Sequence, residues 1–395
     1  MKYTICLALC GALLFGIACQ KDTHIPISEP NPAFEAAIEA TLDLPASPYA
    51  YSLLTEGVHG APETREPLDY NLVTLGRTLF YDKALSIDNS VSCGSCHQQA
   101  LGFADDVAFS DGVNGHVTDR NTLALQTLAS VAETYGGVTV SNSSSRLFWD
   151  ERTAHPEAQI MQTMLNEKEM GMDPYALPDK LKKFDYYHGL WQRLNGTDIN
   201  SFMSARDITK ALGAFMSSLQ TTDSKFDQGM FQLGHNVRAD FKNFSASENL
   251  GKNLFMTNCA SCHAFSLSAN VGLQFSRAHT TACNGLDNEY QDKGAGGIRG
   301  NGLLDGVFKI PGLRNIEVSA PYMHDGRFNT LEEVVEHYNS GVKDHKNLDH
   351  LLKDRNGHAK RLNLSPVEVA ALVDFLKTLT DPVALNDPKW SDPFK

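Results

Sequence analysis

The chain contains the pentapeptide Cys-x-x-Cys-His twice, at Cys93–His97 and at Cys259–His263. Two thiols at this spacing, at the end of a helix, can reach the two vinyl groups on one edge of a porphyrin. The histidine that follows then lies beneath the ring and directs a nitrogen at the iron, as in c-type haem attachment. One copy could be half of a zinc site, but neither copy has a second Cys-x-x-Cys nearby. The two copies predict two covalently bound haem c groups, held through Cys93, Cys96, Cys259 and Cys262 and ligated by His97 and His263.

A short internal repeat precedes the two motifs. Leu75–Phe80 reads Leu-Gly-Arg-Thr-Leu-Phe and Leu250–Phe255 reads Leu-Gly-Lys-Asn-Leu-Phe, so each places Leu and Phe on one face of a short helix. Ser245 and Glu248 form a capping box at the start of the second helix. Two unrelated core helices would also give such stretches. Their position before both motifs favours a duplicated cytochrome domain, in which the shared glycine lets another helix approach closely.

The last helix of the chain is predicted to begin after Ser365. Ser365–Glu368 combines an N-cap serine, a proline at the first helical position and a capping glutamate. The apolar face that follows is made by Val369, Leu372, Val373, Leu376 and Leu379. We expect this face to pack across the helix that begins near Glu248. Because β-strand patterns are sparse, the predicted fold is all-α, with two cytochrome c-like helical domains and their haems near the domain interface.

The predicted domain organisation places an N-terminal haem domain at residues 51–240 and a C-terminal haem domain at residues 241–382. Residues 19–50 form a tether and N-terminal extension, and residues 383–395 form a tail. Residues 1–18 are predicted to be a signal peptide, because Met1-Lys2 is followed by an apolar run from Thr4 to Ala18. That run is too short to span a bilayer comfortably. The chain is therefore expected to be exported to the periplasm.

The end of the predicted signal peptide resembles a bacterial lipoprotein cleavage site, Gly16-Ile17-Ala18-Cys19, although such sites usually carry leucine where Gly16 stands. An ordinary cleaved signal peptide is the alternative. We favour a lipid anchor at Cys19, because a polar tether, Gln20–Pro32, follows it.

Eight cysteines in an exported chain would normally indicate disulfides. Cys6, Cys10 and Cys19 belong to the signal region, however, and four of the other five belong to the haem motifs. The remaining one, Cys283, is either a buried small side chain or a free thiol, and we favour burial. The net charge of −13 argues against nucleic acid or an anionic membrane surface as a partner.

The chain resembles a known family, the bacterial di-haem cytochrome c peroxidases and the related MauG proteins, from about Tyr70 to Thr380. The resemblance rests on short motifs that occur in the family's order around the two haem motifs. They are Gly102-Phe103-Ala104-Asp105, Arg120-Asn121-Thr122, Phe148-Trp149-Asp150, Glu169-Met170-Gly171, Leu313-Arg314-Asn315 and Ala320-Pro321-Tyr322-Met323-His324-Asp325-Gly326.

The resemblance implies roles for three side chains near the first haem. Glu169 stands where the family has its distal acid–base glutamate, which can take a proton from the inner peroxide oxygen and give it to the outer one. Gln159 matches the distal glutamine and would hydrogen-bond the peroxide. Trp149 matches the tryptophan that lies between the haems and assists electron exchange. Without the family, Glu167–Glu169 would be interpreted as a solvated charged turn and Trp149 as a core residue.

The second haem is where the sequence departs from the peroxidases. Thr330 and Glu333 form a capping box that predicts a helix start. Tyr338 in that helix stands where the peroxidases have a methionine as sixth iron ligand, as in MauG-like proteins. A tyrosine ligand would lower the haem potential, whereas methionine raises it. Met323 is the alternative ligand, and Tyr338 could instead be a core residue.

The resemblance also implies a calcium ion between the haems. Asn121 matches one ligand, and backbone carbonyls of Ile310 and Gly312 would supply others. His116 lies in the loop that blocks the first haem in some peroxidases, but it is closer to the following Arg-Asn pair, so we favour an exposed loop histidine. Thr163 stands where the family has a proline, six residues before the distal glutamate.

These features predict a peroxidase that reduces hydrogen peroxide to water at the first haem. The second haem would receive electrons from a small cytochrome c or a copper protein. If charge steers that docking, the acidic chain favours a donor with a basic face. A MauG-like oxidase that modifies a protein side chain and a non-catalytic di-haem electron carrier are the alternatives. The sequence leaves the oligomeric state open, a dimer included.

Overall fold

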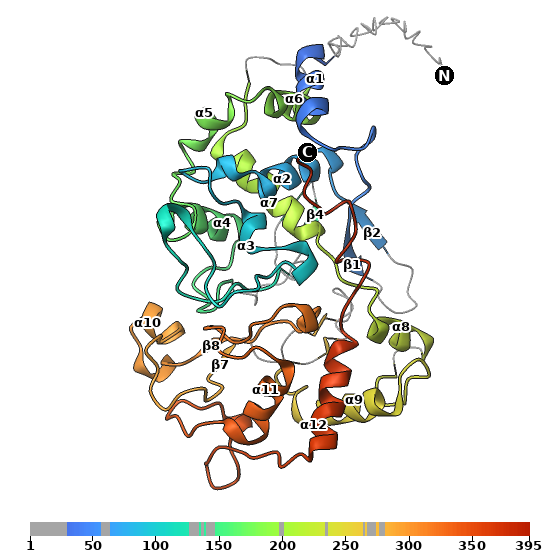
Figure 1. Cartoon of the computed structure of the whole chain (residues 1–395), viewed down its shortest axis with the longest axis vertical. Coiled ribbons are helices and arrows are strands. Elements are labelled where there is room, and N and C mark those ends of the chain that lie inside the picture. Colours follow the sequence, from blue (N-terminus) through green and yellow to red (C-terminus); the bar gives the residue numbers. More distant parts are fainter. Residues whose placement is uncertain are drawn as a thin grey trace, which may run out of the picture.

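The computed structural model describes residues 30–56, 64–125, 134–135, 138–139, 147–196, 201–233, 236–263, 265–266, 274–275 and 281–395. The predicted signal peptide, Cys19 and most of the polar tether lie outside these residues. The chain forms two mainly helical lobes, which lie one above the other in Figure 1. In the described part of the chain, no helix combines the length and the apolar character needed to cross a membrane.

The N-terminal lobe contains seven described α-helices and two short antiparallel hairpins, β1–β2 and β3–β4. In chain order these elements are α1 (Pro32–Thr41), β1 (Ser52–Glu56), β2 (Thr64–Pro67), α2 (Tyr70–Tyr81), α3 (Cys93–Cys96), β3 (Thr134–Tyr135), β4 (Val138–Thr139), α4 (Pro156–Leu165), α5 (Leu177–Leu181), α6 (Asp185–Asn195) and α7 (Ala205–Ser218).

The C-terminal lobe contains the other helices, with β5 paired to β6 and β7 paired to β8. The mostly helical fold that the sequence predicts is thereby confirmed. Its elements are α8 (Lys225–Gln232), α9 (Ala246–Asn258), β5 (Phe265–Ser266), β6 (Gln274–Phe275), β7 (Thr281–Ala282), α10 (Ala295–Arg299), β8 (Phe308–Lys309), α11 (Leu331–Glu336) and α12 (Pro366–Lys377).

Each lobe is built on one pair of crossing helices, α2 with α7 and α9 with α12. A Cβ atom on Gly76 of α2 would lie 1.9 Å from the carbonyl oxygen of Ala211 in α7. A Cβ atom on Gly251 of α9 would lie 1.8 Å from the carbonyl oxygen of Ala371 in α12. Only glycine permits this backbone approach at either crossing. The predicted role of the two repeat glycines is confirmed, and so is the packing of the last helix across α9.

Side-chain caps fix where these helices begin. At α12, the Ser365 backbone N–H donates to Glu368 Oε2 at 2.8 Å, and the Glu368 N–H donates to Ser365 Oγ at 3.4 Å. Ser245 and Glu248 make the same reciprocal pair at the start of α9, at 2.5 Å and 3.1 Å. Both capping boxes satisfy backbone donors that the first helical turn leaves free.

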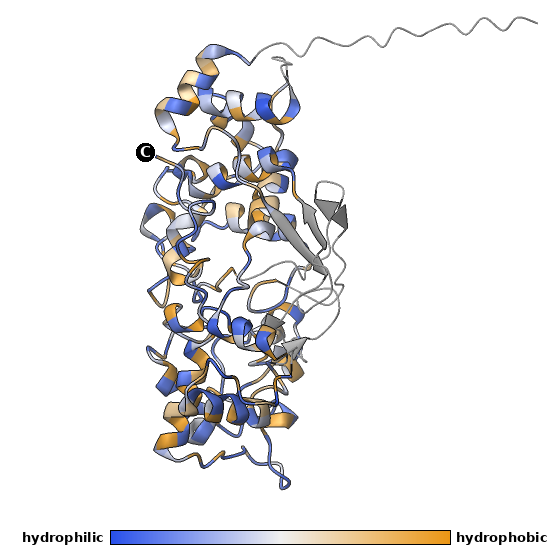
Figure 2. Ribbon diagram, turned by 90° about the vertical axis from the view of Figure 1, so that its right-hand side faces the viewer, coloured by the Kyte–Doolittle hydropathy of each residue, from blue (hydrophilic) through white to orange (hydrophobic). Residues whose placement is uncertain are grey.

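The described residues form three hydrophobic cores, of which the two larger lie one in each lobe, and apolar segments occur in both lobes in Figure 2. The first core includes Leu75, Phe80 and Phe215, whereas the second includes Phe255 and Phe375. Helix α8 contributes its buried apolar side chains to the second core. Helix α8 therefore packs with the second core, and the domain boundary at residue 240 stays a prediction.

The C-terminal tail returns to the N-terminal lobe. Arg77 in α2 donates from Nε to the Ser391 carbonyl at 2.6 Å, and Tyr51 donates to the Lys389 carbonyl at 2.8 Å. Trp390 is buried in the first core. The second half of the predicted 19–50 extension is also folded, because α1 packs against α6. Both ends of the described chain thus help to hold the lobe that contains the first haem motif.

Candidate active site

The first haem motif forms a single helical turn, α3, and His97 follows at its C-terminal end. His97 Nδ1 lies 2.8 Å from the carbonyl oxygen of Phe103, to which it donates. Burial lowers the pKa of His97 to about 4, so the ring is neutral. The bond to Phe103 assigns the proton to Nδ1 and leaves Nε2 as the nitrogen that can bind a metal. This arrangement fits the predicted role of His97 as a proximal haem ligand.

Glu169 lies in a turn that follows α4. Asn166, the C-cap residue of α4, donates from Nδ2 to Glu169 Oε1 at 2.7 Å, and its carbonyl accepts the Glu169 N–H at 2.9 Å. Burial raises the pKa of Glu169 above its usual value, while hydrogen bonds from Asn166 and from the Thr163 side chain act in the opposite direction. The carboxyl group is therefore held in place and tuned by two neighbours from α4 and its cap.

Two other segments hold the backbone of this turn. Val113 donates its N–H to the Glu169 carbonyl at 3.0 Å, and Ile87 donates its N–H to the Met170 carbonyl at 2.9 Å. The negative charge of Glu169 also raises the pKa values of Cys93 and Cys96, although burial is the larger cause for both thiols. The charge of Glu169 thus acts on the first haem motif, and its part in a proton relay stays a prediction.

Gln159 is on the same face of α4 as Thr163, because residues four positions apart are neighbours on a helix. The Thr163 side chain in turn hydrogen-bonds Glu169. Gln159 also lines a cavity together with Phe148 and Trp149. This is the same cavity that Cys259, Cys262 and His263 line, so the predicted cooperation of Gln159 with Glu169 at the first haem stays a prediction.

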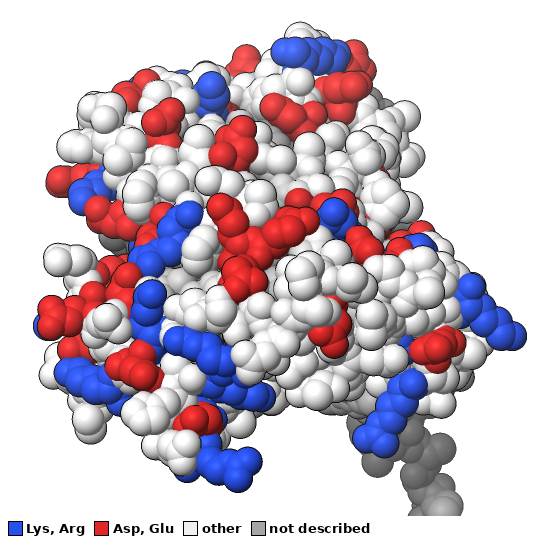
Figure 3. All heavy atoms as spheres, turned by 60° about the horizontal axis from the view of Figure 1, so that its bottom comes forward, with Lys and Arg blue, Asp and Glu red and all other residues white. Residues whose placement is uncertain are grey.

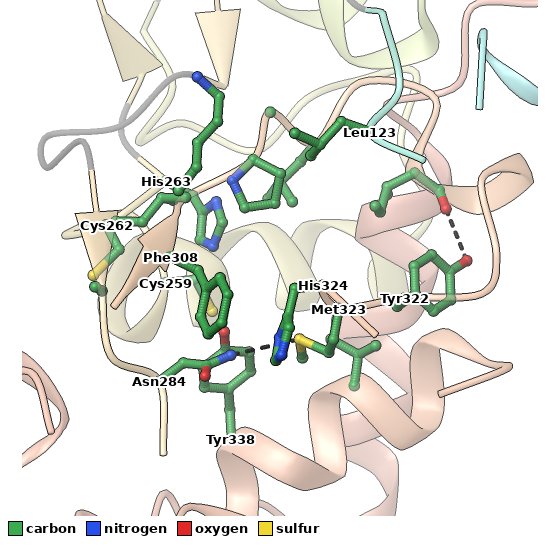
Figure 4. A pocket seen from close by; sticks show the side chains of 18 of the residues that line it. Leu123, Cys259, Cys262, His263, Asn284, Phe308, Tyr322, Met323, His324 and Tyr338 are labelled. Atoms are coloured by element: carbon green, nitrogen blue, oxygen red, sulfur yellow. Dashed lines mark hydrogen bonds between the residues drawn. The ribbon is translucent and has the colours of Figure 1, made fainter. Parts of the chain in front are cut away.

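The second haem motif opens into a cavity of about 320 Å³ that is lined by residues of both lobes. Cys259, Cys262 and His263 form one side, as Figure 4 shows. Burial lowers the pKa of His263 to about 4, opposed by the backbone of Pro311, so this ring is also neutral. The five described cysteines form no disulfide. Two thiols and a neutral imidazole at an apolar cavity fit a covalently attached haem.

Both candidate sixth ligands line this cavity. Tyr338 lies in a π-helical turn, His337–Gly341, that continues α11. Such turns are rare and frequently occur at functional sites. Burial raises the pKa of Tyr338 to about 12, and a side-chain hydrogen bond from Asn284 acts in the opposite direction. Met323 has a positive φ of 76°, which is uncommon for a non-glycine residue, and its sulfur accepts from Asn284 Nδ2 at 3.5 Å.

Trp149 lies where the two lobes meet. Its Nε1 donates to the Asn121 carbonyl at 2.8 Å, and its own carbonyl accepts the Lys309 N–H at 2.7 Å. The Asn121 N–H in turn donates to the carbonyl of His324, whose ring centroid is 6.5 Å from that of Trp149. Trp149 is therefore fixed by polar contacts to segments from both lobes. The predicted electron-exchange role stays a prediction, and the placement is compatible with it.

Ion pairs secure the loop that carries Trp149. Asp150 is buried and pairs with Arg120 at 2.5 Å and with Arg152 at 2.8 Å. Arg120 also reaches Asp292 of the C-terminal lobe at 2.6 Å. Because Asp150 accepts from two cations, its buried charge is compensated.

The remaining sequence predictions concern three residues. Asn121 is buried, lines the cavity and uses Nδ2 to donate to the Val107 carbonyl at 3.1 Å. Its oxygen is then the atom that a cation would bind, and calcium stays a prediction. His116 is exposed, as the sequence analysis favours. Cys283 is buried, with its sulfur 3.5 Å from His345 Nδ1, which confirms the predicted burial.

Sequence reasoning missed two site residues, Asn166 and Asn284. Asn166 directly precedes the charged Glu-Lys-Glu turn, and its position as a helix C-cap could have indicated a structural role. Nothing in the sequence around Asn284 indicates that its side chain reaches both Met323 and Tyr338. That contact depends on segments that are far apart along the chain.

Comparisons with known proteins identify the family of this chain. Residues 70–234 match the family model for di-haem cytochrome c peroxidase, and residues 249–380 match the model for cytochrome c. MauG of Paracoccus denitrificans is 30% identical over 371 residues, covering 82% of this chain and 92% of that protein. The chain belongs to the di-haem cytochrome c peroxidase and MauG family.

Other relatives of this di-haem protein include a cytochrome c peroxidase and a MauG-like protein. The cytochrome-c peroxidase IdrP2 of Pseudomonas sp. (strain SCT) is 29% identical over 348 residues, covering 81% of this chain and 84% of that protein. A solved MauG-like protein associated with microbial copper homeostasis is 26% identical, with a TM-score of 0.65 over 83% of this chain and 94% of that one. As its family implies, the protein is an oxidoreductase with two c-type haems.

Proposed function

We propose that this di-haem protein is a peroxidase that reduces hydrogen peroxide to water at the first haem site, using electrons from a small redox protein. The observation that supports this most strongly is Glu169, a half-buried carboxyl group whose pKa is raised by burial and whose charge acts on Cys93 and Cys96. Peroxide-dependent oxidation of a reduced small cytochrome c by the purified holoprotein tests the proposal.

In this reaction the haem at the first site supplies the redox chemistry. The protein's own contribution is the handling of protons. The unprotonated Glu169 carboxylate takes a proton from the inner oxygen of peroxide and returns it to the outer oxygen, which leaves as water. Asn166 holds Oε1 during this transfer, and Gln159 orients the peroxide by a hydrogen bond. The second haem site receives the electrons, and Trp149 lies on the route between the lobes.

The pH dependence of the rate follows from the protonation state of Glu169. The carboxylate must be unprotonated to take the first proton, so kcat/KM for peroxide falls as the pH drops through the pKa of Glu169. Burial raises that pKa, whereas the Thr163 hydrogen bond lowers it. Thr163→Val is therefore expected to move the acid limb of the pH profile to higher pH. Thr257→Val, at an exposed threonine of the other lobe, serves as the control, and a T163V profile equal to the wild type would contradict the assignment.

The electron donor is proposed to dock on the segment 343–361, which covers one side of the second haem site. Leu351, Leu352 and Lys360 of this segment line the cavity with Cys259 and Cys262. The segment carries six cations against three carboxylates, in a chain with a net charge of −13. In Figure 3, which turns the bottom of Figure 1 forward, Lys and Arg side chains lie at the lower left with Asp and Glu side chains among them. The positive charge of this segment favours a donor with an acidic face, whereas the negative net charge of the whole chain would favour a donor with a basic face.

Turnover with a donor that has an acidic docking face is expected to fall when this segment loses positive charge. K360E/R361E reverses two exposed cations and should lower kcat/KM for such a donor by roughly tenfold at low ionic strength. High salt should remove the difference, because it screens exposed charges. K182E/K183E reverses two exposed lysines of the other lobe and is the matched control. Equal losses in both double variants would contradict docking at this segment.

A MauG-like oxidase is the second candidate, and Tyr338 is the observation that favours it. Tyr338 faces the second haem cavity at the position that MauG-like proteins fill with tyrosine. A protein substrate would then be modified with electrons drawn from its side chain. Absence of peroxide turnover with every reduced donor, together with a long-lived oxidised state after peroxide addition, would favour this alternative.

We also propose that the protein works in the periplasm, with a lipid anchor at Cys19 and a calcium ion at Asn121. Relatives named as cytochrome c peroxidases and MauG support the location, and the residues Gly16–Cys19 support the anchor. Mass spectrometry of the mature N-terminus tests the anchor. Elemental analysis of wild type and Asn121→Ala tests the calcium.

A further inference from the structure

Asn284 lies between the two candidate sixth ligands of the second haem site, two residues after β7. Its Nδ2 donates to the Met323 sulfur at 3.5 Å, the contact that Figure 4 marks with a dashed line. Asn284 and Tyr338 both line the cavity, and a hydrogen bond from the Asn284 side chain acts to lower the pKa of Tyr338 against the larger effect of burial. The backbone carbonyl of Asn284 accepts from His337 Nε2 at 3.1 Å. Asn284 thus contacts both candidates and the π-helical turn that carries one of them.

The orientation of the Asn284 amide is determined by its partners. A thioether sulfur can only accept a hydrogen bond, so the amide nitrogen must face Met323. On the other side, Tyr290 accepts the Leu286 N–H at 2.8 Å, and its hydroxyl hydrogen is free to donate to Asn284 Oδ1 at 3.5 Å. Both amide N–H groups are therefore available to Met323 and Tyr338.

The two ligand atoms respond differently to an N–H donor. A neutral thioether binds iron weakly through one lone pair, and a hydrogen bond to the sulfur competes for that electron density. A phenolate oxygen carries a full negative charge and several lone pairs, so it can accept an N–H and bind a metal together. Hydrogen bonds to ligand atoms from outside the coordination shell are a general means of tuning a metal site. The same amide therefore disfavours ligation by Met323 and favours ligation by Tyr338.

We propose that Asn284 is a positioning residue that selects Tyr338 over Met323 as the sixth ligand of the second haem. The inference rests on the proposed function, in which that haem receives the electrons. A tyrosine ligand keeps its potential low, and a methionine ligand raises it. Asn284 thereby determines whether the second haem has a low or a high reduction potential.

Asn284→Leu in the holoprotein is the direct test, because leucine has a similar volume and no donor. The variant is expected to show the near-infrared sulfur-to-iron charge-transfer band of a methionine-ligated ferric haem and a higher reduction potential at the second haem. Asn284→Asp keeps the shape, replaces the donor by an acceptor and should shift both readouts in the same direction. Adding Met323→Leu to either variant should abolish the new band. Met323→Leu alone should leave the parent spectrum unchanged.

Tyr338→Phe separates this inference from the proposed ligation. If Y338F changes the absorption and potential of the second haem while N284L and N284D keep the parent values, Tyr338 is the ligand and the selection by Asn284 is overturned. If Y338F keeps the parent values, the tyrosine ligation is itself wrong and the inference falls with it. Neither readout depends on peroxide turnover, so failure of the peroxidase proposal is detected separately.

Discussion

Glu169→Gln is expected to lower peroxide turnover by about 10²- to 10⁴-fold, the usual contribution of a positioned general acid–base group. Glutamine keeps the shape of the side chain and the contact with Asn166, but it cannot accept the proton from the inner peroxide oxygen. Because Glu169 ligates no metal, both haems should bind as in the wild type. Steady-state kinetics with a saturating reduced donor, together with the absorption spectrum, measure the two effects separately.

Glu167→Gln is the matched control for this prediction. Glu167 lies in the same turn but is exposed, and it should retain the wild-type rate. If E169Q also retains that rate, the proton relay is assigned to the wrong residue. A non-catalytic di-haem electron carrier would be the better description in that case.

Gly251→Ala is expected to cost about 3 kcal/mol or more of stability, at the upper end of the range for overpacked cores. The added Cβ would lie 1.8 Å from the Ala371 carbonyl oxygen, so α9 and α12 would have to separate. Backbone atoms on both sides cannot rotate away as a flexible side chain can. Thermal unfolding of the holoprotein measures the effect as a lower Tm.

Gly297→Ala provides the control for this substitution. The nearest atom to a Cβ at that position is Lys293 Cβ at 3.5 Å, an ordinary contact. Alanine is also the better helix former, so G297A should keep or slightly raise the Tm. Equal Tm values for G251A and G297A would refute the close crossing of α9 and α12.

The predictable features of the fold were those that depend on residues close together in the sequence. The haem motifs, the capping boxes and the repeat glycines each consist of residues within a few positions of one another, and their physical role does not depend on distant segments. The crossing of α9 and α12 was therefore predicted from Gly251 and from the apolar face after Ser365. Glu169 was different, because only the family motif distinguished it from an exposed charged turn.

Features that depend on contacts between distant segments were not predictable. The end of the chain packs into the first core through Trp390, and α8 packs into the second core. Neither follows from local periodicity. The same limit applies to the site, since Asn284 reaches Met323 and Tyr338 only because β7 and α11 meet at the cavity.

The central claim is that this di-haem protein reduces peroxide with electrons that enter at its second haem. Its most direct test is the stoichiometry of steady-state turnover, measured with purified holoprotein, a reduced small cytochrome c or copper protein, and hydrogen peroxide. We expect sustained, catalytic oxidation of the donor with about two electrons consumed per peroxide, because reduction of peroxide to water requires that number. Donor oxidation that stops after each enzyme molecule has turned over once, or that does not depend on peroxide, would contradict the central claim.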